Sequence, residues 1–145
     1  MSVWVGIDPG EKRIGMARAD ALGVLATPRG VSGNREELQR WLLQVDQDYG
    51  LEGVIIGCPR NMDGSYGPMA LRSLELTRWL RDRNEVPVRL WDERLTTRQA
   101  QSVGTESGLD EKAAAILLQS YVDAGTPQTD DPEGLLEAES NQKPS

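Results

Sequence analysis

Residues 6–15 read Gly-Ile-Asp-Pro-Gly-Glu-Lys-Arg-Ile-Gly, and this stretch decides the fold. The apolar residues of positions 3–7 recur with the period of two that is typical of a β-strand. The strand ends at Asp8, a Pro-Gly pair forces a turn, and a second apolar run begins at Ile14. We therefore predict a hairpin that places Asp8 near the rim of a sheet. A carboxylate is costly to desolvate there unless a cation compensates its charge.

The length and composition bound the class of protein. A chain of 145 residues is expected to form one domain with one core. No run of 18 apolar residues and no signal peptide is present, so we expect a cytoplasmic protein that does not bind membranes. Cys58 is the only cysteine and the chain has no histidine. Any metal must therefore be held by oxygen ligands, which favours Mg²⁺, Mn²⁺ or Ca²⁺.

The net charge of −7 is unevenly distributed. Residues 124–145 carry five acids against one lysine, a net −4, so residues 1–123 carry only −3. The basic residues of that body are 13 arginines and two lysines. Arginine suits bidentate contact with phosphate, although the same bias equally reflects codon composition or surface ion pairs. The total charge therefore does not exclude a nucleic-acid ligand.

Hydrophobic periodicity predicts a mixed five-stranded α/β sheet. The expected strands are residues 3–8, 14–17, 24–27, 53–57 and 87–91, and the expected helices are 35–49, 68–83, 96–103 and 110–121. A polar loop, residues 58–67, follows the fourth strand. We predict a folded domain over residues 1–124 and an acidic, disordered tail over residues 125–145.

Three acids separated in sequence are expected to meet at the end of this sheet. Asp8 and Glu93 follow strands, and Asp110 heads the apolar stripe of the last helix. Convergent carboxylates without histidine would repel one another unless they held divalent cations, and a pair of such ions is the usual arrangement for hydrolysis of a phosphodiester. Each acid also has a structural interpretation, as a turn former, an ion-pair partner or a helix cap. Asp92 is an alternative to Glu93, because alternation alone does not tell which of the two faces Asp8.

Four segments together resemble the motifs of the bacterial YqgF (RuvX-like) family. They are Gly-Ile-Asp-Pro-Gly-Glu-Lys-Arg-Ile-Gly-Met-Ala with Asp20; Val-Ile-Ile-Gly-Cys-Pro-Arg-Asn-Met-Asp-Gly-Ser with Pro68 and Ala70; Asp-Glu-Arg-Leu-Thr-Thr with Ala100; and Asp-Glu-Lys-Ala-Ala-Ala-Ile-Leu-Leu-Gln-Ser-Tyr. The match spans residues 3–123. Cys58 stands where an aliphatic residue is common in the family, and the acidic tail is additional.

The resemblance implies an RNase H-like fold and a nuclease that depends on Mg²⁺ or Mn²⁺, with two ions. By position, the catalytic and metal-binding acids would be Asp8, Glu93 and Asp110. The side chains expected to contact nucleic acid are Lys12, Arg13, Arg60, Asn61 and Arg94.

The activity that the resemblance implies is processing of the 5′ end of pre-16S ribosomal RNA during ribosome biogenesis, or resolution of Holliday junctions in DNA recombination and repair. A catalytically silent module that binds nucleic acid is the main alternative. An actin-like or sugar-kinase nucleotide binder is less favoured, because such proteins enclose the nucleotide between two domains. The expected partner is structured RNA or branched DNA, and the protein is expected to be a monomer or a homodimer.

Overall fold

The computed structural model describes residues 2–92 and 109–142, with the backbone alone at positions 109, 110 and 142. Within these ranges, five strands form one sheet in the order β3-β2-β1-β4-β5. Their bounds are β1 Val3–Pro9, β2 Ile14–Ala19, β3 Ala26–Ser32, β4 Leu51–Cys58 and β5 Val88–Asp92. The predicted helix over residues 96–103 lies outside the described residues.

The sheet is mixed, as the sequence predicts. The first three strands form an antiparallel meander, and β4 and β5 extend the sheet in parallel with β1. Because β1, β4 and β5 are parallel, their carboxyl ends lie at the same edge of the sheet. That edge includes Asp8 near the end of β1, Cys58 at the end of β4 and Asp92 at the end of β5.

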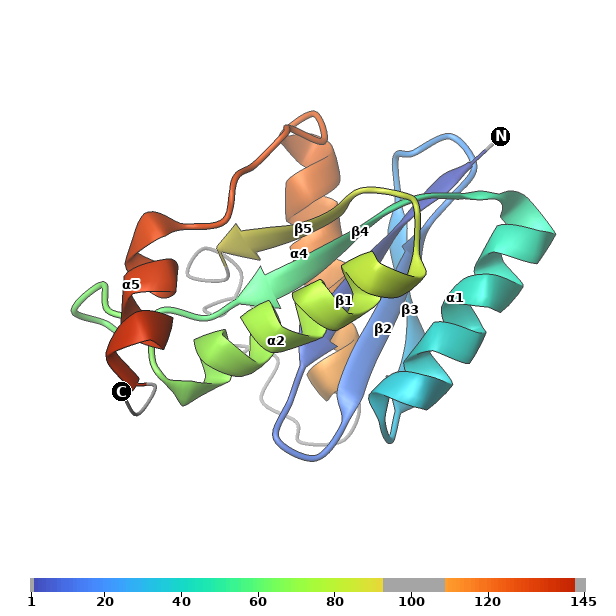
Figure 1. Ribbon diagram of the computed structural model, residues 1–145. Coiled ribbons are helices and arrows are strands. Elements are labelled where there is room, and N and C mark those ends of the chain that lie inside the picture. The colour runs from blue at the N-terminus through green and yellow to red at the C-terminus, as the bar shows by residue number, and fades with distance from the viewer. Residues whose placement is uncertain (1, 93–108, 143–145) are drawn as a thin grey trace.

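Helices cover both faces of the sheet (Figure 1). The described helices are α1 Arg35–Tyr49, α2 Pro68–Arg83, α4 Leu109–Asp123 and α5 Glu133–Gln142. Helices α1 and α2 lie on one face and α4 lies on the other (Figure 1). None of the helices in the described ranges combines the length and the apolarity needed to cross a lipid bilayer.

The alternation of side chains along β1 divides the core in two. Val3, Val5 and Ile7 pack with the apolar stripes of α1 and α2. Trp4 belongs to the second cluster, which is built on α4 around Tyr121. Strand β1 therefore contributes side chains to the hydrophobic core on both faces of the sheet, as the period of two requires.

Helix α1 begins and ends where the sequence predicts. The Asn34 side chain accepts a hydrogen bond from the Glu37 backbone N–H at 2.9 Å, and the Glu37 carboxylate accepts one from Gly33 N–H at 2.8 Å. The helix ends at Gly50, whose φ of 85° is open to glycine at little cost. Strand β4 begins at the next residue, Leu51.

The third strand lies further along the chain than predicted. Residues 24–27 were expected to form it, with Pro28 and Gly30 as its end, but β3 continues to Ser32. Its pairing with β2 includes Ala17 with Pro28 and is irregular between Gly15 and Ala17. Because β3 is the edge strand, a proline can face away from the ladder without removing a hydrogen bond.

The acidic segment after Gly125 is ordered over residues 125–142, where the sequence predicts disorder. It runs along the β5 edge of the sheet and forms α5 beside α2 (Figure 1). Leu135 is fully buried in the α1–α2 core, and Gly134 lies against the Tyr66 ring. The prediction rested on the low apolar content of the segment, but the buried Leu135 and the ion pairs Arg78–Glu139 and Arg81–Asp131 attach it.

Candidate active site

Asp8 lies in the sheet near the carboxyl end of β1, as predicted. It pairs with Gly15 across the hairpin, and Ile7, the residue before it, pairs with Ile56 of β4 on the other side. Trp4 and Gly6 contact α4, so alternation places Asp8 on the α4 face of the sheet. The residue is half-buried.

Helix α4 runs antiparallel to β1 and brings its first turn to the level of Asp8. Tyr121 packs edge-on against Trp4, with ring centroids 5.1 Å apart, while Ala114 and Leu118 lie over Gly6. A Cβ at position 6 would come within 2.7 Å of Leu118 Cβ, so glycine sets this close approach. One turn of helix rises about 6 Å from position 114 to position 110, and two residues of strand advance about 7 Å from Gly6 to Asp8.

The backbone of Asp110 is therefore at the same end of the sheet as Asp8. Position 110 belongs to the first turn of α4, as the sequence predicts. The register of α4 on β1 brings these two acid-bearing positions together from a separation of about a hundred residues.

Asp92, the alternative second acid, belongs to the opposite face. Along β5, Val88 and Leu90 pack in the α1–α2 core, while Trp91 joins the α4 cluster. The Asp92 carboxylate is 3.9 Å from Arg60 Nη1. Alternation thus places Asp92 on the face that Asp8 does not share, which disfavours it as a partner of Asp8.

Glu93 and Arg94 lie outside the described residues, so their predicted roles stay predictions. Among the side chains that the structure does describe, no three acidic or cysteine residues gather as a metal site would require. The described contribution to such a site is the Asp8 carboxylate, a hard oxygen donor of the kind that Mg²⁺ and Mn²⁺ prefer. Cys58 is buried and belongs to the α1–α2 core, consistent with a small hydrophobic role.

Lys12 and Arg13 belong to the tight turn between β1 and β2. The turn is closed by a hydrogen bond from Gly10 N–H to Arg13 O at 2.8 Å. A pocket of about 260 Å³ lies against it, lined by residues 9–14 of the turn, 33–35 before and at the start of α1, and Arg72, Glu75 and Leu76 of α2. Lys12 and Arg13 are both exposed, at positions close to Asp8.

Arg60 and Asn61 make contacts within their own loop. Arg60 Nε donates to Gly64 O at 2.9 Å, and its guanidinium lies 4.7 Å from the centre of the Tyr66 ring. Asn61 Nδ2 donates to Ser65 Oγ at 3.0 Å. The Asp63 carboxylate accepts from the hydroxyl and backbone N–H of Ser65, hydrogen bonds that lower the pKa of Asp63. Asp63 is thus a turn residue, as its Asp-Gly sequence indicates.

Comparison with known proteins identifies the family. A family model described as "RuvX: Holliday junction resolvase" matches residues 2–124. The chain belongs to the RuvX family. The match to the family model confirms the resemblance seen in the four motifs. The matched residues include the sheet, with its β1–β2 hairpin, and helix α4.

Curated relatives of this RuvX-family chain match along most of its length. One, from Symbiobacterium thermophilum, is 40% identical over 135 residues, which cover 82% of this chain and 90% of the relative. Another, from Syntrophomonas wolfei, is 36% identical over 134 residues, covering 84% and 94%. Both carry the name "Putative pre-16S rRNA nuclease".

Solved structures confirm the RNase H-like fold of this RuvX-family member. Thermus thermophilus RuvC bound to a Holliday junction superposes with a TM-score of 0.53 at 17% identity, covering 87% of this chain and 96% of that one. The fowlpox virus resolvase bound to junction DNA gives a TM-score of 0.51 at 13% identity, covering 86% and 99%. At these identities the likeness concerns the fold.

Sequence reasoning missed two arginines near the β1–β2 turn. Arg35 and Arg72 line the same pocket as Lys12 and Arg13. Arg35 is the first residue of α1 and Arg72 lies in the second turn of α2, and no spacing in the sequence connects them. The one available signal was the Asn34 cap, which fixes Arg35 as the first residue of α1.

Proposed function

We propose that this RuvX-family chain is a metal-dependent nuclease that hydrolyses phosphodiester bonds in structured nucleic acid, and that its substrate is the precursor of 16S ribosomal RNA. The observation that carries the proposal is that Asp8 and the first turn of α4 lie at the same end of the sheet, the carboxyl end of β1. The name shared by the relatives supports RNA processing as the function. Such a role would place the protein in the cytoplasm, where ribosomes assemble.

Asp8, Glu93 and Asp110 are the residues proposed to hold Mg²⁺ or Mn²⁺, as two ions. The donor set fits, since it consists of carboxylate oxygens and the chain offers no histidine. A bound divalent cation supplies the positive charge that lowers the pKa of water and stabilises the leaving oxygen. Asp8 pairs with Gly15 of β2, and Ile7 before it pairs with Ile56 of β4, so the residue lies on a rigid element.

The basic residues of the turn are proposed to position the strand to be cut. Lys12 and Arg13 follow Asp8 by four and five residues and would bring positive charge to the phosphate backbone where it passes the β1–β2 turn. Arg94, next to Glu93 in sequence, would do the same from the other side. These contacts carry no base specificity, so recognition of the substrate would depend on its shape.

Substitution of Asp8 by asparagine tests the proposal. The Asp8→Asn variant keeps the size of the side chain and removes its charge. We expect cleavage of a pre-ribosomal RNA leader in Mg²⁺ or Mn²⁺ to fall by at least about a hundredfold, with unchanged thermal unfolding. Asp82→Asn is the matched control, because Asp82 is an exposed residue near the carboxyl end of α2. Cleavage by highly purified Asp8→Asn at the wild-type rate would refute the assignment.

The same assay separates the alternative substrates. A four-way DNA junction is assayed for cleavage in parallel with the RNA leader. Faster cleavage of the junction would identify a Holliday junction resolvase, which is the activity named in the description of the family. A twofold-symmetric junction would favour a homodimer with two sites, whereas trimming an RNA end needs one. Binding to both substrates without cleavage in either metal would indicate a silent binding module.

A further inference from the structure

The pocket beside the β1–β2 turn is open to an anion. Its cationic side chains are Lys12, Arg13, Arg35 and Arg72, and its acidic ones are Glu11 and Glu75. The lining thus has an excess of two positive charges in a chain whose net charge is −7. Arg35 Nε lies 3.7 Å from Glu36 Oε1, an exposed carboxylate that is not part of the lining.

The pocket lies on the other side of β1 from the catalytic acid. Ile14 and Leu76, two of its lining residues, belong to the α1–α2 core. Asp8 lies on the α4 face, and Pro9, the next residue, lines the pocket. The two places therefore lie on opposite faces of the end of β1. The β1–β2 turn forms the rim of the sheet at this end (Figure 1).

Two of the cationic side chains are held by contacts, Arg72 by the β1–β2 turn and Arg35 by a ring outside the lining. Arg72 Nη2 donates to Glu11 O at 3.1 Å, which attaches the turn to α2. The Arg35 guanidinium lies 4.8 Å from the centre of the Trp79 ring, and this stacking restricts the side chain. Lys12, at the exposed tip of the turn, completes the positive wall. The N–H groups at the start of α1 are partly used by Asn34 and Glu37, so the basic side chains are the main attraction for an anion.

We propose that this pocket binds a phosphate group of the nucleic-acid substrate at a position removed from the scissile bond. The inference rests on the proposed nuclease function for the identity of the ligand. A strand whose scissile phosphate lies at Asp8 would pass around the β1–β2 turn and place a second phosphate between Lys12, Arg35 and Arg72. Such a second contact fixes the direction of the strand in the site, which a single contact at the scissile bond does not.

Binding measured without metal tests this proposal apart from catalysis. An RNA hairpin with a single-stranded 5′ extension is titrated with the full chain in EDTA, at several salt concentrations. For the double variant with Lys12→Gln and Arg35→Gln, we expect affinity to fall by on the order of tenfold and the slope of log Kd against log salt to fall by at least about 0.7. Arg40→Gln is the control, since Arg40 is an exposed residue of α1 outside the pocket.

The proposal would be overturned if the double variant and Arg40→Gln changed the affinity and its salt dependence equally. It would also be overturned if the wild type showed no measurable binding to the RNA. Thermal unfolding of each variant checks the fold, and Arg72→Gln provides an independent variant with the same expected loss. Inorganic phosphate added to the isotope-labelled protein should shift the amide resonances of residues 10–13 and 33–35, and shifts elsewhere alone would also count against the pocket.

Two forms of the RNA distinguish the kind of phosphate. If the double variant loses the same factor of affinity for 5′-phosphorylated RNA as for 5′-hydroxyl RNA, the pocket binds an internal diester. A larger loss of affinity for the phosphorylated RNA would identify a terminal phosphate. Because no cleavage is measured, failure of the nuclease assignment at Asp8 would leave a positive result here intact. Conversely, cleavage by a protein whose pocket variants bind normally would reject the pocket alone.

Discussion

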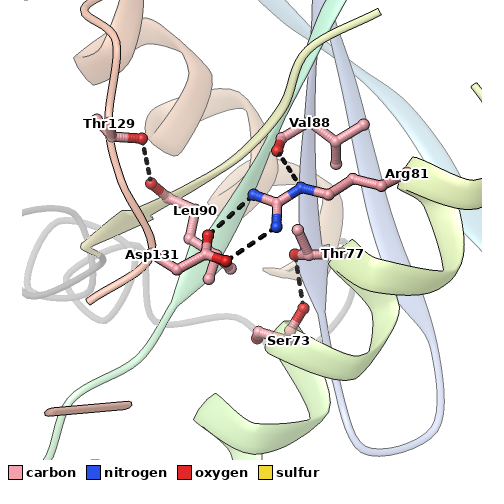
Figure 2. A network of polar contacts seen from close by, with 7 residues as sticks. All are labelled: Ser73, Thr77, Arg81, Val88, Leu90, Thr129 and Asp131. Carbon is pink, nitrogen blue, oxygen red and sulfur yellow. Dashed lines mark hydrogen bonds and ion pairs between the residues drawn. The ribbon is translucent and has the colours of Figure 1, made fainter. Parts of the chain in front are cut away.

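Arg81 donates two hydrogen bonds to Asp131, one from each terminal nitrogen to a separate carboxylate oxygen, both at 2.9 Å. Its Nε also donates to the carbonyl of Val88, so one side chain joins α2, β5 and the segment that precedes α5 (Figure 2). Thr129, two residues before Asp131, donates to the carbonyl of Leu90 at 3.2 Å (Figure 2). The acidic segment after α4 is thus attached to the edge strand of the sheet.

Replacing Asp131 by asparagine should weaken this attachment. The pair is partly exposed, which limits its contribution to about 1 kcal/mol of unfolding free energy. We expect that loss in urea unfolding of the full chain, together with faster proteolysis within residues 125–142. Asp130→Asn is the matched control, since Asp130 is the exposed neighbour in sequence. Equal stability of the two variants would mean that the ion pair does not hold the segment.

The same ion pair predicts a dependence of stability on pH. The hydrogen bonds from Arg81 lower the pKa of Asp131 in the folded protein. A carboxylate with a lowered pKa stabilises the fold above its unfolded value of about 3.9, and that contribution is lost as the pH falls through the lower folded value. The difference in unfolding free energy between wild type and Asp131→Asn should therefore be constant from pH 7 to about pH 5 and shrink below pH 4. A difference that grows on acidification would contradict this sign.

Introducing a methyl group at position 6 should separate α4 from β1. An alanine Cβ there would be 2.7 Å from Leu118 Cβ and 2.9 Å from the Ala114 carbonyl oxygen, and neither neighbour is the flexible end of a side chain. We expect Gly6→Ala to cost about 1–3 kcal/mol in unfolding free energy, because the helix must shift. Cleavage should fall as well, since the shift moves position 110 away from Asp8.

Gly33→Ala is the control for this substitution. Its Cβ would be 3.5 Å from the nearest atom, the Glu37 carboxylate, which is an ordinary contact. A loss of stability in Gly6→Ala no greater than in Gly33→Ala would show that the close approach is not required.

The strand and helix pattern was predictable because its signals are local. The alternation in β1, the Asn34 cap and the proline that begins α2 all act within a few residues of the element they define. The position of Asp8 at the rim of the sheet follows from the turn that comes directly after it. The sequence therefore predicted both the sheet and the end of it at which Asp8 lies.

What the sequence could not predict depends on contacts between distant segments. The order in residues 125–142 arises from Arg78 and Arg81 of α2, which pair with Glu139 and Asp131 about 50 to 60 residues away. Arg35 and Arg72 line the same pocket because α1 and α2 lie on the same face of the sheet (Figure 1). Likewise, the faces of Asp8 and Asp92 could be assigned only when the partners of β5 were known.

The loop contacts of Arg60 predict that its removal will leave phosphate binding unchanged. Its guanidinium contacts the Gly64 carbonyl, the Tyr66 ring and the Asp92 carboxylate, which together favour a role in shaping the loop. For Arg60→Ala we expect the salt dependence of RNA binding to match that of wild type, with a lower unfolding temperature. A slope reduced by about 0.7 to 0.9 would instead assign Arg60 to a phosphate contact, the role expected from sequence.

The assignment of the second acid can be tested by comparing two adjacent carboxylates. Asp92 lies on the α1–α2 face, 3.9 Å from Arg60, while Asp8 lies on the α4 face. A metal ion bound to Asp8 would be out of reach of Asp92, because the strand backbone separates the two faces. We therefore expect Asp92→Asn to keep metal-dependent cleavage within about threefold of wild type, whereas Glu93→Gln should lose it as Asp8→Asn does.

Titration with Mn²⁺ gives the comparison a readout besides activity. Water-proton relaxation should show weaker Mn²⁺ binding for Asp8→Asn and Glu93→Gln than for wild type, and unchanged binding for Asp92→Asn. Thermal unfolding of Asp92→Asn accounts for any loosening of the loop that Arg60 holds. The reverse pattern, with Asp92→Asn deficient in both metal binding and cleavage and Glu93→Gln active, would replace Glu93 by Asp92 in the proposed site. Because the two residues are adjacent, a general change in charge at this edge of the sheet would affect both variants alike and could not produce either pattern.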